Sequence, residues 1–477
     1  MRLLAIAVLA SVVPLGLATA PAEPTAPEPR RPALQLSTCS LPDVPFPARC
    51  GRLEVFEDRA RATGRRLSLT VAILAARSPH PRPDPIVYLA GGPGVAATGE
   101  AGFVASTFAP LLAERDVILV DLRGTGGSNP LDCELGLGLL TREATAAELA
   151  TCREHLAGRA DLRFYTTALA MDDLDDVRAA LGVPVVNLLA HSYGTLAAQV
   201  YVARHGEHVR AAVLESVLPP GPEPYLADGE DAERALGEML AACAREPACH
   251  AAYPHPRDEL NATLARLAAK PVEVLSEKIL LTRDVFAATV RARMYSAKAA
   301  ARLPRALHEA YAGDYRDMAH AAATIAAASA NGQSQALHLS VVCTGAIGAL
   351  TREQIEARNK NTFLGAAPLL ARHADCAAWP RGEAPADLAR PLASEVPALV
   401  LSGAWDPVTP PRNAERVQRG FPRSLALTVP EAGHAFDDAC TVGIVRAFLD
   451  AGSANGLDSG CLARKPRVVF EVGRPPA

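Results

Sequence analysis

The sequence lacks a strong charge of either sign, and it contains very little lysine. Its 477 residues include 48 basic and 52 acidic side chains, so that the formal net charge is only -4. A chain with this balance has no strong overall field that would draw it onto nucleic acid or anionic lipid, and we expect neither as a partner. Arginine supplies nearly all of the basic residues, which we attribute to genome composition rather than to function. Because 49% of the residues are hydrophobic, the chain can bury a core, and disorder throughout is excluded.

Long apolar runs are also absent, except at the N-terminus. After a basic second residue, residues 3–17 are apolar, and small residues follow them. This layout is typical of a secretory signal peptide, and a run of this length is too short to span a membrane comfortably. We predict a signal peptide over residues 1–22, with cleavage after Ala22 or Ala20, and a stiff proline-rich leader over residues 23–35. The protein is therefore expected to be secreted or periplasmic and free of the membrane after cleavage; an uncleaved anchor is the alternative.

Cysteine motifs for zinc binding or redox chemistry are missing as well, because no two cysteines have the Cys-x-x-Cys spacing. The ten cysteines are an even number in a chain with a predicted export signal, and this favours a disulfide framework. They fall into neighbouring couples, and we predict that each couple closes a local loop. The predicted pairs are Cys39 with Cys50, Cys133 with Cys152, Cys243 with Cys249, Cys343 with Cys376, and Cys440 with Cys461.

Short apolar runs with turn signals behind them predict the strands of a mostly parallel sheet that is buried on both faces. Helical periodicity lies between them, most clearly over residues 171–181 and 195–205, and a closing helix is predicted over residues 442–449. The predicted strands are residues 86–89, 117–120, 185–189, 211–214, 398–401 and 425–429, preceded by a β pair over residues 52–56 and 66–76.

An insertion interrupts this alternation of strands and helices. The stretch over residues 219–395 is rich in Ala, Arg and Leu with helical spacing, and we expect it to be an inserted cap of three or four helices. One α/β domain is therefore predicted, in two parts around a lid. Its core covers residues 36–218 and 396–464, and a C-terminal tail covers residues 465–477.

Four aspartates lie close together on the predicted helix over residues 171–181. Carboxylates in such a group are the ligand type that divalent cations prefer. Their i, i+3 and i+4 spacing is also that of an ordinary solvated helix face, however, so we predict no metal site there. The four residues are Asp172, Asp173, Asp175 and Asp176.

The clearest chemical signal is a serine between a predicted strand and a predicted helix. Residues 190–194 follow the Gly-x-Ser-x-Gly pattern of a nucleophile elbow, with Ala190 in the first glycine position. Small residues are needed two before and two after the serine because the backbone is strained and closely packed there, and alanine nearly meets that need. We predict that Ser192 is a nucleophile and that the following helix N-terminus favours developing negative charge. A serine in an ordinary turn is the alternative.

An alcohol is a weak nucleophile at neutral pH, so Ser192 needs a base, and the base needs an acid that orients it. Asp406 and His434 each follow a predicted strand, and the chain order is that of α/β hydrolases, with serine first, acid second and histidine last. We predict Asp406 as the orienting acid and His434 as the general base. Glu215 is an alternative acid, whereas His191 should point away from the position of the base.

A tetrahedral intermediate would need backbone donors for its oxyanion. We predict the amides of Tyr193 and Gly92 as these donors, with Gly91 as the alternative to Gly92. An ordinary turn is the other interpretation of the Gly91-Gly92-Pro93-Gly94 segment. The glycine-rich loop over residues 121–128 lacks the Gly-Lys-Ser/Thr ending of a nucleotide-binding loop, and we interpret it as a turn that supports the floor of the site.

With these motifs placed, residues 39–461 resemble the proline iminopeptidase and tripeptidyl aminopeptidase family of α/β-hydrolase serine peptidases, especially its secreted tripeptidyl branch. The sequence departs from the family pattern at Ala90, which stands where iminopeptidases have histidine, and at Ala190, which replaces a glycine. The stretch over residues 215–219 matches only loosely and leaves the substrate preference open. The resemblance rests on Gly91-Gly92-Pro93-Gly94, residues 121–128, Ser192-Tyr193-Gly194-Thr195, residues 403–410, Gly433-His434, Cys376-Ala377-Ala378-Trp379-Pro380, and Cys440 with Cys461.

The resemblance implies an α/β-hydrolase fold with an inserted, mainly helical cap, no metal or organic cofactor, and hydrolysis of peptide bonds near a free N-terminus. Recognition of the amine requires a carboxylate near the pocket, and Glu215, Glu223 and Asp228 are the candidates. We thus expect an exported serine aminopeptidase of the proline iminopeptidase or tripeptidyl type, acting through an acyl-enzyme on Ser192. A carboxylesterase or lipase of the same fold is the alternative, because a triad does not distinguish amides from esters. An inactive binding protein on this scaffold is a third hypothesis, and the sequence indicates neither the residue preference nor the oligomeric state.

Overall fold

A nine-stranded sheet lies at the centre of the computed structural model, which describes residues 34–133, 135, 144–384 and 392–473. The predicted signal peptide and most of the predicted leader lie outside these residues. The strand order is β1-β2-β3-β5-β4-β6-β7-β10-β11, in which β1, β2, β3 and β5 pair antiparallel and the other neighbours pair in parallel. The strands are β1 (Ser37–Cys39), β2 (Ala48–Phe56), β3 (Arg66–Leu74), β4 (Ile86–Leu89), β5 (Val117–Val120), β6 (Val186–His191), β7 (Val209–Glu215), β10 (Ala398–Gly403) and β11 (Ser424–Val429).

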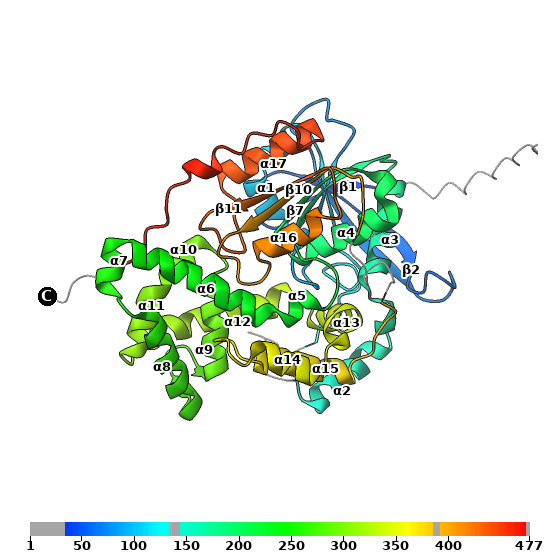
Figure 1. The fold of residues 1–477 in the computed structure, drawn as a ribbon. Coiled ribbons are helices and arrows are strands. Elements are labelled where there is room, and N and C mark those ends of the chain that lie inside the picture. Colours follow the sequence, from blue (N-terminus) through cyan, green and yellow to red (C-terminus); the bar gives the residue numbers. More distant parts are fainter. Residues whose placement is uncertain (1–33, 134, 136–143, 385–391, 474–477) are drawn as a thin grey trace, which may run out of the picture. The chain divides into compact units, whose positions relative to one another are not determined.

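The central strands are apolar without a break because they contact a hydrophobic layer on each face of the sheet. In β5, Ile118 and Val120 belong to one layer, whereas Val117 and Leu119 belong to the other. Helices α2, α3, α4 and α16 contribute to the first layer, and Figure 1 shows α1 and α17 on the opposite face. This doubly covered, mostly parallel sheet confirms the predicted fold class. The helices are α1 (Ala101–Thr107), α2 (Ala146–Ala157), α3 (Thr167–Ala180), α4 (Tyr193–His205), α16 (Pro411–Gln418) and α17 (Ala439–Ala451).

The segment between β7 and β10 forms a helical cap with its own hydrophobic core, and it is more divided than predicted. Instead of three or four helices, its described residues form eleven α-helical segments and a two-stranded sheet (Figure 1). Prolines account for part of this division: Pro247, Pro256, Pro304 and Pro368 each lie in the first turn of a new helix, where the missing N–H is not needed. The elements are α5 (Glu223–Leu226), α6 (Asp228–Arg245), α7 (Pro247–Ala252), α8 (Pro256–Ala269), β8 (Val272–Val274), β9 (Ile279–Leu281), α9 (Arg283–Arg293), α10 (Ala297–Ala300), α11 (Leu303–Tyr311), α12 (Arg316–Gly332), α13 (Gln335–Gly345), α14 (Arg352–Asn359) and α15 (Ala367–Ala378).

The prediction that the four aspartates of α3 lie on a solvated helix face is wrong for Asp173. This side chain is 1% exposed, and its carboxylate accepts hydrogen bonds from Arg123 at 2.6 and 2.8 Å and from Arg59 at 2.8 Å. Arg123 belongs to the glycine-rich loop after β5, in which Asp121 also accepts a hydrogen bond from the Gly127 amide at 2.9 Å. The loop is thus a structural turn that is tied to α3.

The structure contains the five predicted disulfides, and none of the described cysteines is free. Disulfides persist in oxidising compartments, so the framework agrees with the predicted export. Among the described residues, no helix combines the length and the apolar character that crossing a membrane requires.

Loss of a cap disulfide is expected to destabilise the protein according to the length of the loop that it closes. Replacing Cys343 and Cys376 by alanine opens a loop of 33 residues, for which the chain-entropy model gives about 4 kcal/mol. The pair Cys243 and Cys249 closes only 6 residues, for which the same model gives about 2 kcal/mol. All four side chains are buried, so the comparison isolates loop length. Denaturant-induced unfolding measures both losses, and equal losses would contradict this explanation.

The residues after the second part of the core pack against both the core and the cap. The Val468 amide donates to the Glu431 carboxylate at 2.6 Å, close to the loop after β11. The ring of Phe470 lies 6.2 Å from that of Trp405, and Glu471 forms an ion pair with Arg302 of the cap at 2.7 Å. These contacts connect the loops after β10 and β11 to the cap.

Candidate active site

The predicted functional residues lie in loops that leave the sheet at the carboxyl ends of neighbouring strands. β4 ends beside β6, with Leu89 paired to Ala190, and β6 ends beside β7, with His191 paired to Glu215. β10 lies between β7 and β11 and is parallel to both. Because parallel strands end at the same edge of the sheet, these loops are neighbours. They carry Gly91 to Gly94 after β4, Ser192 after β6, Ser216 after β7, Asp406 after β10 and His434 after β11.

Ser192 occupies a strained turn between β6 and α4. Its φ is 54° and its ψ is -122°, a conformation that costs a residue with a Cβ about 1 to 3 kcal/mol. The turn is held because the Ser192 amide donates to the Glu215 carbonyl at 2.9 Å and the Ser192 carbonyl accepts from the Thr195 hydroxyl at 2.6 Å. Residue 194 has to be glycine, since a Cβ there would lie 2.2 Å from the carbonyl oxygen of Leu89. The hydroxyl therefore stands on a sharp bend that its surroundings stabilise.

Asp406 and His434 form a buried, hydrogen-bonded pair. His434 Nδ1 lies 2.9 Å from Asp406 Oδ2, and both side chains are buried. The Thr409 hydroxyl donates to the same carboxylate oxygen at 2.7 Å, and the amides of Val408 and Thr409 donate to Oδ1 at 2.8 and 2.9 Å. These donors fix the carboxylate, and the imidazole that it holds presents Nε2 on the side away from Asp406.

The pKa of Asp406 is lowered although the residue is buried. Burial alone would raise this pKa, but the imidazole of His434 and the hydrogen bonds from His434 and Thr409 outweigh burial and hold the pKa well below its usual range. An ionised carboxylate keeps the imidazole proton on Nδ1, which makes Nε2 the proton acceptor. The carboxylate bonded to His434 is thus Asp406 and not Glu215, the alternative acid.

The end of β7 joins the serine loop to the histidine loop. The Glu215 carbonyl accepts the Ser192 amide, and the next residue, Ser216, donates its hydroxyl to the His434 carbonyl at 2.6 Å. Ser216 also has a positive φ of 53°, and its amide donates to the Leu401 carbonyl at 2.8 Å. This two-residue bridge keeps the predicted nucleophile and the predicted base on adjacent loops.

Two rings flank the imidazole of His434. The ring centroids of His191 and of Tyr295, which belongs to the cap, each lie 5.0 Å from that of His434. The expectation that His191 points away from the base is therefore wrong; its ring lies next to both Gly91 and His434. Burial, and secondly the proximity of His434, lower the pKa of His191 to about 3. A group with so low a pKa is a weak proton acceptor, so His191 is poorly suited to be a general base near neutral pH.

Of the residues predicted to supply the oxyanion donors, Tyr193 follows Ser192 in the chain, and the alternative donor Gly91 lies close to it. Tyr193 is the first residue of α4, so its amide is at a helix N-terminus, where the amide dipoles favour negative charge. The glycine loop after β4 also reaches the nucleophile, because a Cβ on Gly91 would lie 3.3 Å from the Ser192 Cβ. Gly92 follows with a φ of 44°. The arrangement can stabilise an oxyanion on a carbon that Ser192 attacks.

Two of the three carboxylates predicted to recognise an amine are paired with arginines. Asp228, at the start of α6, forms an ion pair with Arg291 of α9. Glu223 forms one with Arg358 at 3.3 Å. Burial raises the pKa of Asp228, Arg291 opposes this, and the charge of Asp406 adds to it. The charge of Asp228 is therefore compensated by the guanidinium of Arg291.

Glu215 has no ion-pair partner among the described residues. It is 8% exposed, and burial raises its pKa to about 8, with a smaller contribution from Asp437. A cationic amine next to this carboxyl would favour its ionised form. Because Glu215 lies beside His191 in the sheet, such an amine would bind close to the nucleophile.

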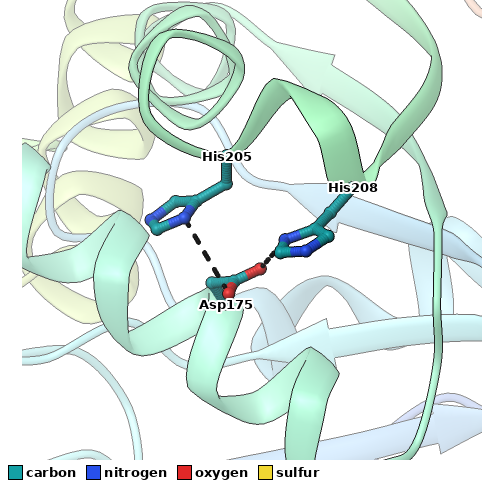
Figure 2. Close-up of side chains that lie close together, drawn as sticks. All are labelled: Asp175, His205 and His208. Carbon is teal, nitrogen blue, oxygen red and sulfur yellow. Dashed lines mark hydrogen bonds and ion pairs between the residues drawn. The ribbon is translucent and has the colours of Figure 1, made fainter. Parts of the chain in front are cut away.

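Within the part of the chain that the structure describes, one group of residues of metal-ligating type lies between α3 and the end of α4. Asp175, His205 and His208 bring ligand atoms within 4.8 Å of one another, and Figure 2 shows both imidazoles beside the carboxylate. The Asp175 carboxylate is already bonded, however: its Oδ1 accepts from His208 at 2.8 Å, from Arg178 at 2.6 Å and from the Tyr201 hydroxyl at 2.8 Å. A guanidinium bonded to this carboxylate places positive charge where a cation would bind, so these residues do not fit a metal.

Three residues of the site were not anticipated from the sequence: Thr409, Ser216 and Tyr295. A signal existed for Thr409, because a hydroxyl and amides two or three residues after an aspartate are typical of a local turn in which the carboxylate accepts them. Ser216 and Tyr295 had none, since each acts through contacts with a segment more than a hundred residues away in the chain.

Comparisons with known proteins agree with the fold. Residues 84–249 match a family model described as alpha/beta hydrolase fold, and residues 362–461 match one described as TAP-like protein. A tripeptidyl aminopeptidase of Streptomyces coelicolor is 29% identical over 197 residues, which are 37% of this chain and 36% of that protein. The serine protease Hip1 of Mycobacterium tuberculosis is 28% identical over 235 residues, which are 44% of each protein. The chain thus covers less than half the length of these relatives.

Solved structures of low sequence identity are similar as well. A proline iminopeptidase of Mycobacterium smegmatis has a TM-score of 0.41 and 16% identity, covering 84% of this chain and 98% of that chain. A thermophilic esterase of Thermogutta terrifontis has a TM-score of 0.38 and 15% identity, covering 84% of this chain and 99% of that chain.

Proposed function

We propose that this α/β-hydrolase chain is an exported serine peptidase, related to the tripeptidyl aminopeptidases, that releases residues from the free N-terminus of peptides. The observation that carries the proposal is the buried, hydrogen-bonded pair of Asp406 and His434, whose loop is bonded to the end of β7, as the strained Ser192 turn is. The relatives from Streptomyces and Mycobacterium, both named as peptidases, support hydrolysis of peptide bonds. The five disulfides support export.

In the proposed reaction, His434 accepts the proton of the Ser192 hydroxyl through Nε2 while the oxygen attacks the scissile carbonyl carbon. Ionised Asp406 stabilises the imidazolium that forms. The amides of Gly92 and Tyr193 donate to the oxyanion. The imidazolium then protonates the leaving amine, and water releases the acyl group from Ser192 by the same steps in reverse order.

We further propose that a carboxylate near the triad receives the substrate amine. Glu215 is supported by its lack of an ion-pair partner among the described residues and by its place at the end of β7, whereas Glu223 and Asp228 are each already paired with an arginine. Tyr295, which is 37% exposed beside His434, offers an aromatic wall from the cap.

Acetylation of the substrate's N-terminus is expected to lower kcat/KM by about 100-fold or more, because it removes a charge-assisted hydrogen bond to a buried carboxylate. A panel of peptides with free and acetylated ends, incubated with the mature protein and followed by mass spectrometry, measures the ratio. Equal cleavage of both series would contradict the aminopeptidase activity. Hydrolysis of simple esters without any cleavage of peptides would instead support the carboxylesterase alternative.

A further inference from the structure

The glycine loop of the predicted oxyanion hole is held by the cap. Gln333, in the two-residue link between α12 and α13, donates its side-chain Nε2 to the carbonyl of Pro93 at 2.7 Å. The next residue, Ser334, donates its amide to the Gly94 carbonyl at 2.9 Å. Val95 and Gln333 also form an isolated antiparallel bridge. Residues 93–95 of the glycine loop and residues 333–334 of the cap are thus joined by hydrogen bonds between consecutive residues.

The loop and the cap segment fit closely. A Cβ on Gly94, whose φ is 109°, would lie 2.4 Å from the carbonyl oxygen of Ser334. A Cβ on Gly92 would lie 3.1 Å from Gln333 Nε2. The cap therefore occupies the space that side chains on this loop would fill, and the Gln333 amide lies against the residue whose N–H is the predicted donor.

The side chain of Gln333 is itself held in place. Its Nε2 lies 3.2 Å from Nδ1 of His338, which is in the first turns of α13. Burial, and secondly the charge of Arg372, lower the pKa of His338 to about 3. A hydrogen bond to the Pro93 carbonyl acts in the opposite direction and raises this pKa, but by less. The imidazole is therefore neutral at working pH, and protonation does not disturb the arrangement.

We propose that Gln333 is a positioning residue, which fixes the glycine loop so that the Gly92 amide points at the oxyanion. The inference rests on the proposed function, because it concerns the oxyanion donor of that reaction. Gln333 acts through Pro93 and not by touching the substrate. A released loop would weaken a hydrogen bond that forms fully only in the transition state, so the loss is expected in kcat and not in substrate binding. Docking of α13 is thereby coupled to catalysis.

Gln333→Ala is expected to lower kcat about 10- to 100-fold and to change KM less than about twofold, for a peptide that the wild type cleaves. Gln333→Met keeps a similar length without the donor and should show the same loss, so it replaces the alanine variant if that variant does not fold. The matched control is Gln335→Ala: this side chain starts α13 and accepts from the Leu135 amide at 3.0 Å instead of bonding the glycine loop. The control should keep wild-type kcat.

Two further measurements separate positioning from a general loss of structure. The inhibition constant of a peptide boronate, which mimics the tetrahedral intermediate, should rise in parallel with the loss of kcat/KM in Gln333→Ala, while the pH profile of kcat/KM keeps its shape. If the wild type is active and the Gln333→Met variant has an unchanged kcat, the inference is overturned. A Gln333→Met variant that changes only KM overturns it as well. A wild type that fluorophosphonate does not label refutes the proposed function itself.

Discussion

Replacing Ser192 by alanine is expected to abolish fluorophosphonate labelling and to lower kcat by about a million-fold, the loss that follows when a triad loses its nucleophile. The substitution removes only the hydroxyl, and the backbone bonds of the turn to Glu215 and Thr195 remain. Any residual rate would come from the oxyanion donors and from binding. Active-site labelling and steady-state kinetics on a peptide substrate measure both effects.

Unfolding has to be excluded as the cause of that loss. Ser192→Gly should be as inactive as the alanine variant but at least as stable as the wild type, because glycine adopts a φ of 54° without strain. Ser402→Ala is the matched serine control: its hydroxyl is also at the end of a strand, is buried, and has no hydrogen-bond partner among the described residues. Near-normal activity of Ser192→Ala would refute the assignment of the nucleophile.

Strands of the sheet could be predicted from the sequence because a parallel strand buried on both faces has a strong local signal. The predictions for residues 86–89 and 117–120 coincide with β4 and β5. The prediction for β7 began too late, at residue 211, because Arg210 interrupts the apolar run. Its guanidinium bonds Asn187 at 3.1 Å and the Leu449 carbonyl at 2.7 Å, partners that no local pattern reveals.

A tertiary contact explains why the burial of Asp173 escaped prediction, whereas the division of the cap follows in part from prolines that the sequence itself contains. Asp173 is buried only because Arg123, 50 residues earlier, neutralises it. Helical spacing in an Ala- and Leu-rich segment shows that helices form, but the number of helices depends on where prolines start new ones.

The site could be predicted where its functional residues come directly after predicted strands. An elbow after β6 and polar residues after β10 and β11 lie at the same edge of the sheet because these strands are parallel, and the structure brings Asp406 and His434 into contact. The orientation of His191 and the contact of Gln333 with the glycine loop depend on packing between distant segments. The amine-binding carboxylate stays a prediction for the same reason.

Asp406→Asn is expected to lower kcat by about 10,000-fold, which is the typical loss when the acid of a triad becomes an amide. The reason lies in the donors around this side chain. The amides of Val408 and Thr409 donate to Oδ1 and cannot reverse, so they will hold the amide oxygen of the new asparagine. Its NH2 group must then face His434 Nδ1. The imidazole is thereby forced to carry its proton on Nε2, where it cannot accept the proton of Ser192.

The same geometry defines the control. Thr409→Val removes one hydroxyl that donates to Asp406 Oδ2 and leaves both backbone donors and the His434 tautomer unchanged. Losing one hydrogen bond to a charged group corresponds to a fall in kcat of about tenfold, three orders of magnitude less than for the asparagine variant. Steady-state kinetics on one peptide substrate, with thermal unfolding to show that both variants fold, measures the difference. If Asp406→Asn kept more than about a tenth of wild-type kcat, another carboxylate would have to orient the base, and Glu215 would be the next to replace.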